Sequence, residues 1–276
     1  MSERAPLHLQ LVSGELAGGE SAPERTILFL HGILGSGDNW LGTARRFVAA
    51  RPEWGAVVAD LRLHGRSGAG RPPHTVEAAA LDVVAALAGR GIAPAAVSGH
   101  SFGSKVAFRV AELLPAPPRT VWLLDADPGA RPAAAGTSLV LGVIAALRTL
   151  PRSYERREEF TGALTARGFS ESLAGWLGKN LVREGSGLRL PLDLDAIEAV
   201  LADFHAVDLW PRIPRAPFEI HAVIGGRSDA FGAPARARLA AAAGSGVLRL
   251  HEIPEAGHWL HIDAPRELLE RFLAVV

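Results

Sequence analysis

The most informative stretch of the sequence is the pentapeptide Gly-His-Ser-Phe-Gly at residues 99–103. A short apolar run precedes it and predicts a strand, and apolar side chains at helical spacing follow it. A serine on such a turn is strained and exposed, and the helix behind it offers free N–H groups to an oxyanion. We therefore predict that Ser101 is a nucleophile, the alternative being an ordinary strand-to-helix turn. Gly99 and Gly103 are expected because side chains there would collide across so tight a turn.

A nucleophilic serine needs a base, and the loop Glu-Ala-Gly-His-Trp at residues 255–259 offers one. His258 would take the proton from Ser101 and later give it to the leaving group. The chain has ten histidines, so it is the position of His258 after the serine that singles it out. The other histidines lack this context, among them His205, His251 and His261.

The third part of such a site is an oxyanion hole. Residues 26–30 form a continuous apolar run that predicts a buried strand, and a His-Gly-rich loop follows at 31–37. We expect the backbone N–H groups of Ile33 and Phe102 to be the donors. His31 is interpreted as a structural hydrogen-bonding residue, because His258 already serves as the base. The loop lacks the Lys-Ser/Thr pair of a phosphate-binding loop.

Taken together, these motifs resemble the α/β-hydrolase superfamily over nearly the whole chain. The loops at 31–36, 60–67 and 257–261 resemble the first loop, the Asp-x-Arg-x-His-Gly-x-Ser loop and the histidine loop of that superfamily. Within it, Gly-Ser-x-Asn-Trp together with Gly-His-Ser-Phe-Gly-Ser-Lys, which ends at Lys105, looks most like the small serine esterases of the YbfF and ABHD11 type.

The resemblance leaves two candidates for the acid that orients His258. Most of the superfamily places it in a later loop as Gly-x-x-Asp, which Asp229 fits when the loop is counted from Gly226. Counted from Gly225, the slot holds Ser228, as in the YbfF-like proteins, where the acid follows an earlier strand in a segment like Asp-Ile-x-Pro. The sequence Leu-Asp-Ala-Asp-Pro around Asp125 resembles that segment. We favour Asp125 and keep Asp229 as the alternative.

Strand and helix signals alternate along most of the chain, which predicts an α/β fold with a mostly parallel sheet and helices on both faces. Ligands then bind beyond the carboxyl ends of the strands, where Ser101, Asp125 and His258 all fall. The expected strands are 7–12, 27–30, 57–61, 95–98, 120–124, 218–224 and 247–253, and the expected helices are 40–50, 76–89, 104–114, 233–243 and 265–276.

The alternation stops between residues 131 and 217, where helical patterns succeed one another. We expect an α/β-hydrolase core of residues 1–130 and 218–276 with an inserted helical cap at 131–217 that controls substrate entry. The alternative is that these helices extend the core. The predicted helices of the insertion are 139–150, 154–167, 173–182 and 194–204. The acyl side of the pocket would be lined by Ile33, Leu34, Trp40 and Phe102.

The composition excludes several classes of function. Lys and Arg total 29, as do Asp and Glu, so the chain carries no basic surface for nucleic acid or anionic membranes. The absence of cysteine excludes disulfides, thiolate catalysis and cysteine-ligated zinc. The first residues lack the apolar core of a signal peptide, and no apolar run is long enough to span a membrane. We expect a cytoplasmic protein that uses no cofactor or metal.

The predicted function is that of a serine hydrolase, a carboxylesterase that acts on small to medium apolar acyl esters through a Ser-His-Asp triad and an acyl-enzyme. The alternative is a non-esterase with the same fold: a cofactor-free lyase, a perhydrolase, an acyltransferase or a ligand-binding receptor. The fold alone does not separate these classes, but the intact Ser101 and His258 favour the esterase.

Overall fold

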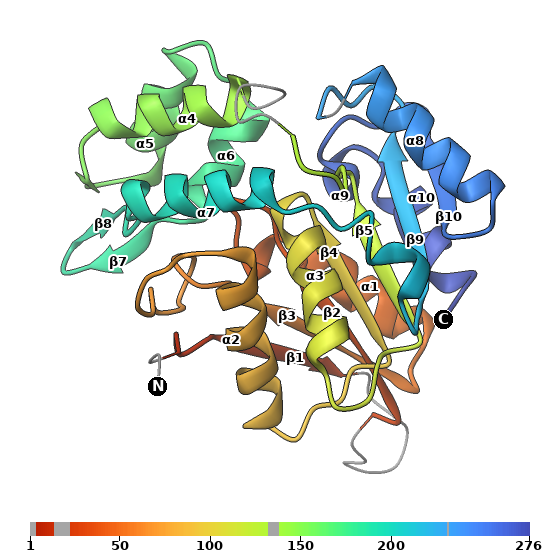
Figure 1. Ribbon diagram of the computed structural model, residues 1–276. Helices are drawn as coiled ribbons and strands as arrows, with labels where there is room; N and C mark the ends of the chain where they lie inside the picture. The colour runs from red at the N-terminus through yellow and green to blue at the C-terminus, as the bar shows by residue number, and fades with distance from the viewer. Residues whose placement is uncertain (1–3, 14–22, 132–137, 231) are drawn as a thin grey trace.

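The computed structural model describes residues 4–13, 23–131, 138–230 and 232–276, and a seven-stranded sheet forms its centre (Figure 1). The strand order is β1-β3-β2-β4-β5-β9-β10. All neighbouring strands pair in parallel except β1, which runs antiparallel to β3 at the edge. The α/β class and the mostly parallel sheet are therefore confirmed. The strands are β1 (Leu9–Ser13), β2 (Arg25–Leu30), β3 (Trp54–Ala59), β4 (Ala96–His100), β5 (Thr120–Leu124), β9 (Glu219–Gly225) and β10 (Arg249–Ile253).

Helices cover both faces of this sheet because its central strands are apolar on both sides. In β2, Ile27 and Phe29 join one buried cluster, whereas Leu28 and Leu30 point the other way into a second cluster. The first cluster includes side chains of α1 (Leu41–Ala50) and α10 (Pro265–Leu273). The second includes side chains of α2 (Val76–Ala88), α3 (Phe102–Leu113) and α8 (Ala233–Gly244). Further short helices are η1 (Gly37–Asn39), α9 (Leu260–Asp263) and η2 (Ile213–Arg215), the last of which lies shortly before β9.

Residues 138–206 form a layer above the carboxyl ends of the strands, drawn in green and cyan in Figure 1. It holds α4 (Ser138–Thr149), α5 (Arg157–Thr165), α6 (Glu171–Gly178) and α7 (Leu194–Ala206). It also holds a small antiparallel sheet of β6 (Ser153–Tyr154), β8 (Gly187–Arg189) and β7 (Val182–Glu184).

A helix is present at each of the four positions expected in this segment, but its small sheet was not predicted. Strands β7 and β8 form a hairpin whose turn contains Gly185 at φ +60°, a conformation that favours glycine. Strands β7 and β8 are each three residues long, and β6 is two residues long. So short a run carries no recognisable alternation of apolar and polar side chains.

Candidate active site

Ser101 occupies the sharp turn between β4 and α3. Its φ is +52° and its ψ is −118°, which is a strained conformation for a residue with a side chain. A Cβ atom built on Gly99 would lie 1.9 Å from the carbonyl oxygen of Gly103, and one built on Gly103 would lie 2.5 Å from that of His31. The expectation that the turn needs both glycines is confirmed.

Asp125 directly follows β5, and three hydrogen bonds hold its wholly buried carboxylate. Its Oδ2 lies 2.7 Å from Nδ1 of His258, and the hydroxyl of Ser228 donates to the same oxygen. Its Oδ1 accepts from the backbone N–H of Gly225 at 2.9 Å. Asp125 and His258 are 133 residues apart in the sequence, so this contact is tertiary.

This hydrogen bond determines what the His258 ring can do. If Nδ1 carries the proton that points at Asp125, the other ring nitrogen, Nε2, is free to accept a proton. The side chain of His258 is 20% exposed and lines the same cavity as Ser101. Asp229 also lines this cavity, but its side chain is exposed, and it is Asp125 that bonds to the imidazole.

The loop after β2 passes close to Ser101. A Cβ atom built on Gly32 would lie 3.3 Å from the Cβ of Ser101, so a side chain at this position would crowd the serine. The N–H of Leu34, at φ +60°, donates to Nε2 of His64 at 3.0 Å, which holds the backbone beyond Ile33. Phe102 is the first residue of α3, and its N–H therefore has no carbonyl partner within the helix.

Two buried histidines shape this loop. The Nδ1 of His31 lies 2.7 Å from the carbonyl oxygen of Gly32, and its Nε2 accepts from the N–H of Leu61 at 2.9 Å. The structural role expected for His31 is therefore confirmed. Burial lowers the pKa of His64 to about 3, which keeps its ring neutral and its Nε2 able to accept. Sequence reasoning did not assign this role to His64, although its Asp-x-Arg-x-His-Gly motif was the available signal.

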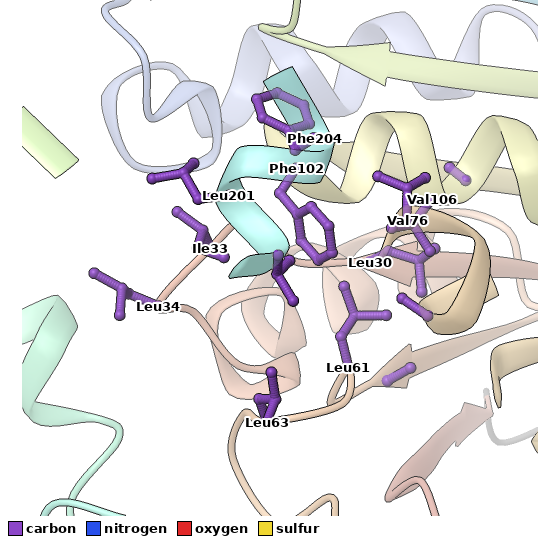
Figure 2. Close-up of a cluster of buried hydrophobic side chains, with 14 of the residues drawn as sticks. Leu30, Ile33, Leu34, Leu61, Leu63, Val76, Phe102, Val106, Leu201 and Phe204 are labelled. Carbon is purple, nitrogen blue, oxygen red and sulfur yellow. The ribbon is translucent and has the colours of Figure 1, made fainter. Parts of the chain in front are cut away.

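A cavity of about 420 Å³ opens over Ser101 between the core and the inserted helices. Ile33, Leu34 and Phe102 line it, as expected from the sequence. The insertion contributes further walls: Val140, Val143, Leu173, Trp176, Leu177, Leu201 and Phe204. The rings of Phe102 and Phe204 meet edge to face at 6.2 Å, and Figure 2 shows them beside Ile33 and Leu201.

The expectation that Trp40 lines the pocket was wrong. Its side chain is 1% exposed and belongs to the cluster between the sheet and helices α1 and α10. Its ring stacks on Phe29 at 5.4 Å and on His261 at 4.7 Å. The turn η1 follows the loop at 31–36 and leads into Trp40, whose side chain packs beneath the site rather than in it.

Lys105 was part of the sequence motif, but its role was not foreseen. Its side chain is buried, and its ammonium group donates to three backbone carbonyls, those of Gly129 at 2.8 Å, Phe204 at 2.7 Å and Val207 at 2.6 Å. Burial lowers the pKa of Lys105 to about 8. This side chain thus ties the helix of Ser101 to the end of α7, where Phe204 faces the cavity.

Within the ranges that the structure describes, no group of three or more His, Asp or Glu side chains is arranged to hold a metal ion. In the same ranges, no helix has the length and apolar character needed to cross a bilayer.

A model of the alpha/beta hydrolase family matches residues 27–271, and the chain belongs to this family. It is 27% identical to the mouse (Mus musculus) sn-1-specific diacylglycerol lipase ABHD11, over 96% of this chain and 83% of that protein. It is 36% identical to lipase LipV of Mycobacterium tuberculosis (strain ATCC 25618 / H37Rv), over 39% of each chain. The solved structure of a marine microorganism esterase superposes with a TM-score of 0.81 at 23% identity, covering all of both chains. The family match and the mouse relative identify a hydrolase.

Proposed function

We propose that the chain is a serine carboxylesterase, with Ser101 as nucleophile, His258 as general base and Asp125 as the acid that orients it. The observation that carries this proposal is the 2.7 Å hydrogen bond from His258 to a buried Asp125, in the wall of the cavity that also contains the strained Ser101. The relatives and the structural neighbour named above are lipases and an esterase, which supports carboxylic ester hydrolysis.

The chemistry follows from the positions of these groups. His258 takes the proton of Ser101 through Nε2 as the hydroxyl oxygen attacks the ester carbonyl. The N–H groups of Ile33 and Phe102 stabilise the negative oxygen that forms. The imidazolium then protonates the leaving alcohol, and the acyl group stays on Ser101. Water activated by His258 releases the acid and regenerates the serine.

The cavity indicates the class of substrate. Its volume of about 420 Å³ lies at the small end of the range for ligand pockets, and most of its lining is apolar. We therefore expect small to medium acyl groups. The segment 131–217 acts as a cap that shields the acyl-enzyme from bulk water, because its helices supply much of the wall opposite Ser101.

A fluorophosphonate probe tests the nucleophile. We expect it to label Ser101 covalently, with mass spectrometry locating the adduct on the peptide that contains residues 99–103. Ser101→Ala should lose labelling and on the order of 10³-fold or more in turnover of p-nitrophenyl esters, because serine and base act as a unit. Ser172→Ala is the matched control, since Ser172 lines the same cavity from an exposed position. Near wild-type turnover in a folded Ser101→Ala protein would refute the proposal.

A further inference from the structure

Arg131 brings a positive charge to the wall of the cavity. Its side chain is half-buried, its Nη1 donates to the carbonyl of Ala230, and its guanidinium lies 5.8 Å from the ring centre of Phe204. The carboxylate of Asp127 acts on it through charge but makes no hydrogen bond to it. Burial lowers the pKa of Arg131, so the cation is only partly compensated by its surroundings.

His205 lies next to this cation on the same cavity wall. Its carbonyl accepts from the N–H of Arg131 at 2.9 Å, and its side chain is 3% exposed. Its Nε2 is buried and has no hydrogen-bond partner among the described residues. Burial, with the charges of Arg131 and Lys105, lowers the pKa of His205 to about 4. The ring is therefore neutral near pH 7 and can donate one N–H to an acceptor.

Most of the other charged groups around this wall are already engaged. Lys105 uses its ammonium group on three backbone carbonyls. The nearby carboxylates of Asp127, Asp203 and Asp208 each accept from a backbone N–H, those of Gly129, Val76 and Trp210 respectively. Asp229 lines the cavity from an exposed position. Among the described residues, Arg131 and His205 thus both offer unmet hydrogen-bond donors to the cavity, and the buried Nε1 of Trp176, which also lines it, is likewise without a partner.

We propose that Arg131 and His205 form a carboxylate subsite, so that the preferred substrate is an ester that also carries an ionised carboxylate at a distance from the scissile bond. A guanidinium binds a planar carboxylate through paired N–H groups, and the single charge of Arg131 matches a monoanion. A dianion such as phosphate would place a second charge near Asp127 without compensation. The apolar walls between Ser101 and this subsite accommodate the carbon chain that joins the two groups.

The carboxylate subsite rests on the esterase function proposed above. Two pairs of esters test it. Each pair exchanges a methyl group for a carboxylate: methyl pentanoate against monomethyl glutarate, and p-tolyl acetate against 4-acetoxybenzoate. The first pair places the charge on the acyl side and the second on the leaving group. We expect kcat/KM to favour the carboxylate by about tenfold or more in one pair, which also identifies the side that binds. Preference for the neutral ester in both pairs would overturn the proposal.

Variants distinguish a role of Arg131 in substrate binding from a purely structural role. Arg131→Gln should lower kcat/KM for the favoured carboxylate ester by on the order of 10²-fold, mainly through KM, and leave its neutral partner within about threefold. Arg131→Lys should retain part of the preference, and His205→Phe should lose part of it. Arg227→Gln is the control, since Arg227 also lines the cavity but is exposed and paired with Glu255. Equal losses on both esters in Arg131→Gln would make Arg131 a structural residue and refute the subsite.

Binding measurements on a variant that cannot turn over the ester distinguish failure of the subsite from failure of the esterase function. If the wild type hydrolyses none of the four esters, the esterase proposal fails, and calorimetry still decides on the subsite. We expect monomethyl glutarate or 4-acetoxybenzoate to bind Ser101→Ala protein, and binding to weaken by on the order of 10²-fold in Ser101→Ala/Arg131→Gln. Equal affinity in the two proteins, or no binding to either, would refute the subsite.

Discussion

At the scale of single residues, backbone strain marks the site. Among the described residues, four other than glycine have positive φ: Leu34, Leu63, Ser101 and Asp125. They lie in the segments that follow the carboxyl ends of β2, β3, β4 and β5. The N–H of Ser101 donates to Leu124, and that of Asp125 donates to Val223, so hydrogen bonds to neighbouring strands hold both conformations. The sheet therefore holds the strained backbone conformations that position Ser101 and Asp125.

Replacement of each candidate acid by asparagine gives the sharpest prediction at the level of single residues. Asp125→Asn should lower kcat by on the order of 10⁴-fold, because an amide favours the wrong tautomer of His258. Asp229→Asn should stay within about threefold of wild type, because its side chain is exposed. Steady-state kinetics with circular dichroism as a folding control measures both. An inactive Asp229→Asn beside an active Asp125→Asn would reverse the assignment.

Ser228 contacts Asp125 from the slot that holds an aspartate in most of the superfamily. Its hydroxyl donates to the Asp125 oxygen that also faces His258. Ser228→Ala should lower kcat by about tenfold with little change in KM, because the carboxylate loses one of its donors while the cavity keeps its shape. Ser228→Thr, which keeps the hydroxyl, should recover much of the rate. A kcat unchanged in Ser228→Ala would show that the bond does not help to orient the triad.

At the scale of elements, a few buried polar contacts attach the insertion to the core. Lys105 of α3 binds carbonyls at the end of α7, and Nδ2 of Asn180, which follows α6, donates to the carbonyl of Leu34 at 2.6 Å. The carboxylate of Asp203 in α7 accepts from the first N–H of α2 at 2.7 Å. Each contact joins one inserted element to one core element, so the position of the cavity wall depends on them.

Removal of the Lys105 charge should loosen this attachment. Lys105→Met leaves three carbonyls without their donor, and we expect the free energy of unfolding to fall by about 2–4 kcal/mol. KM for the bulkier esters should rise more than for the smallest one, because Phe204 loses its anchor. The other lysine of the chain, Lys179, is exposed, and Lys179→Met should leave stability and KM unchanged. Equal stability of the two variants in chemical denaturation would contradict this role.

At the scale of the whole molecule, the depressed pKa of Lys105 predicts how stability varies with pH. Between about 8 in the folded chain and 10.5 in the unfolded chain, the unfolded state binds more protons. Lys105 therefore raises the free energy of unfolding as the pH rises through that range. Few other side chains titrate in this pH range, because the chain has two lysines, one tyrosine and no cysteine.

Comparison with Lys105→Met isolates this contribution. The stability of the wild type relative to that variant should increase between about pH 7.5 and about pH 9.5, as measured by urea denaturation at several pH values. Because both proteins share every other titrating group, the difference between them reports Lys105 alone. A difference that stays constant or shrinks would show that Lys105 titrates near its ordinary value in the folded protein.

The sequence alone determined the elements whose signal is local. Strand β5 was predicted at its observed bounds, because a buried parallel strand is a continuous apolar run with clear ends. The turn around Ser101 was predicted because Gly99 and Gly103 are a local steric requirement. The three-residue strands β7 and β8 were missed, since so few residues carry no periodicity and their pairing arises only in the folded chain.

The packing of distant segments determines which side chains meet. The strand order β4-β5-β9 places Asp125, rather than Asp229, against His258 across 133 residues, a choice that the sequence left open between two registers. Trp40 packs on the other face of the sheet and therefore does not line the pocket. The path of the insertion places Arg131 and His205 on one wall of the cavity. Turn geometry and strand formation depend on neighbouring residues, and so the sequence displays them. Contacts between distant segments depend on how the layers pack, which no short stretch of residues encodes.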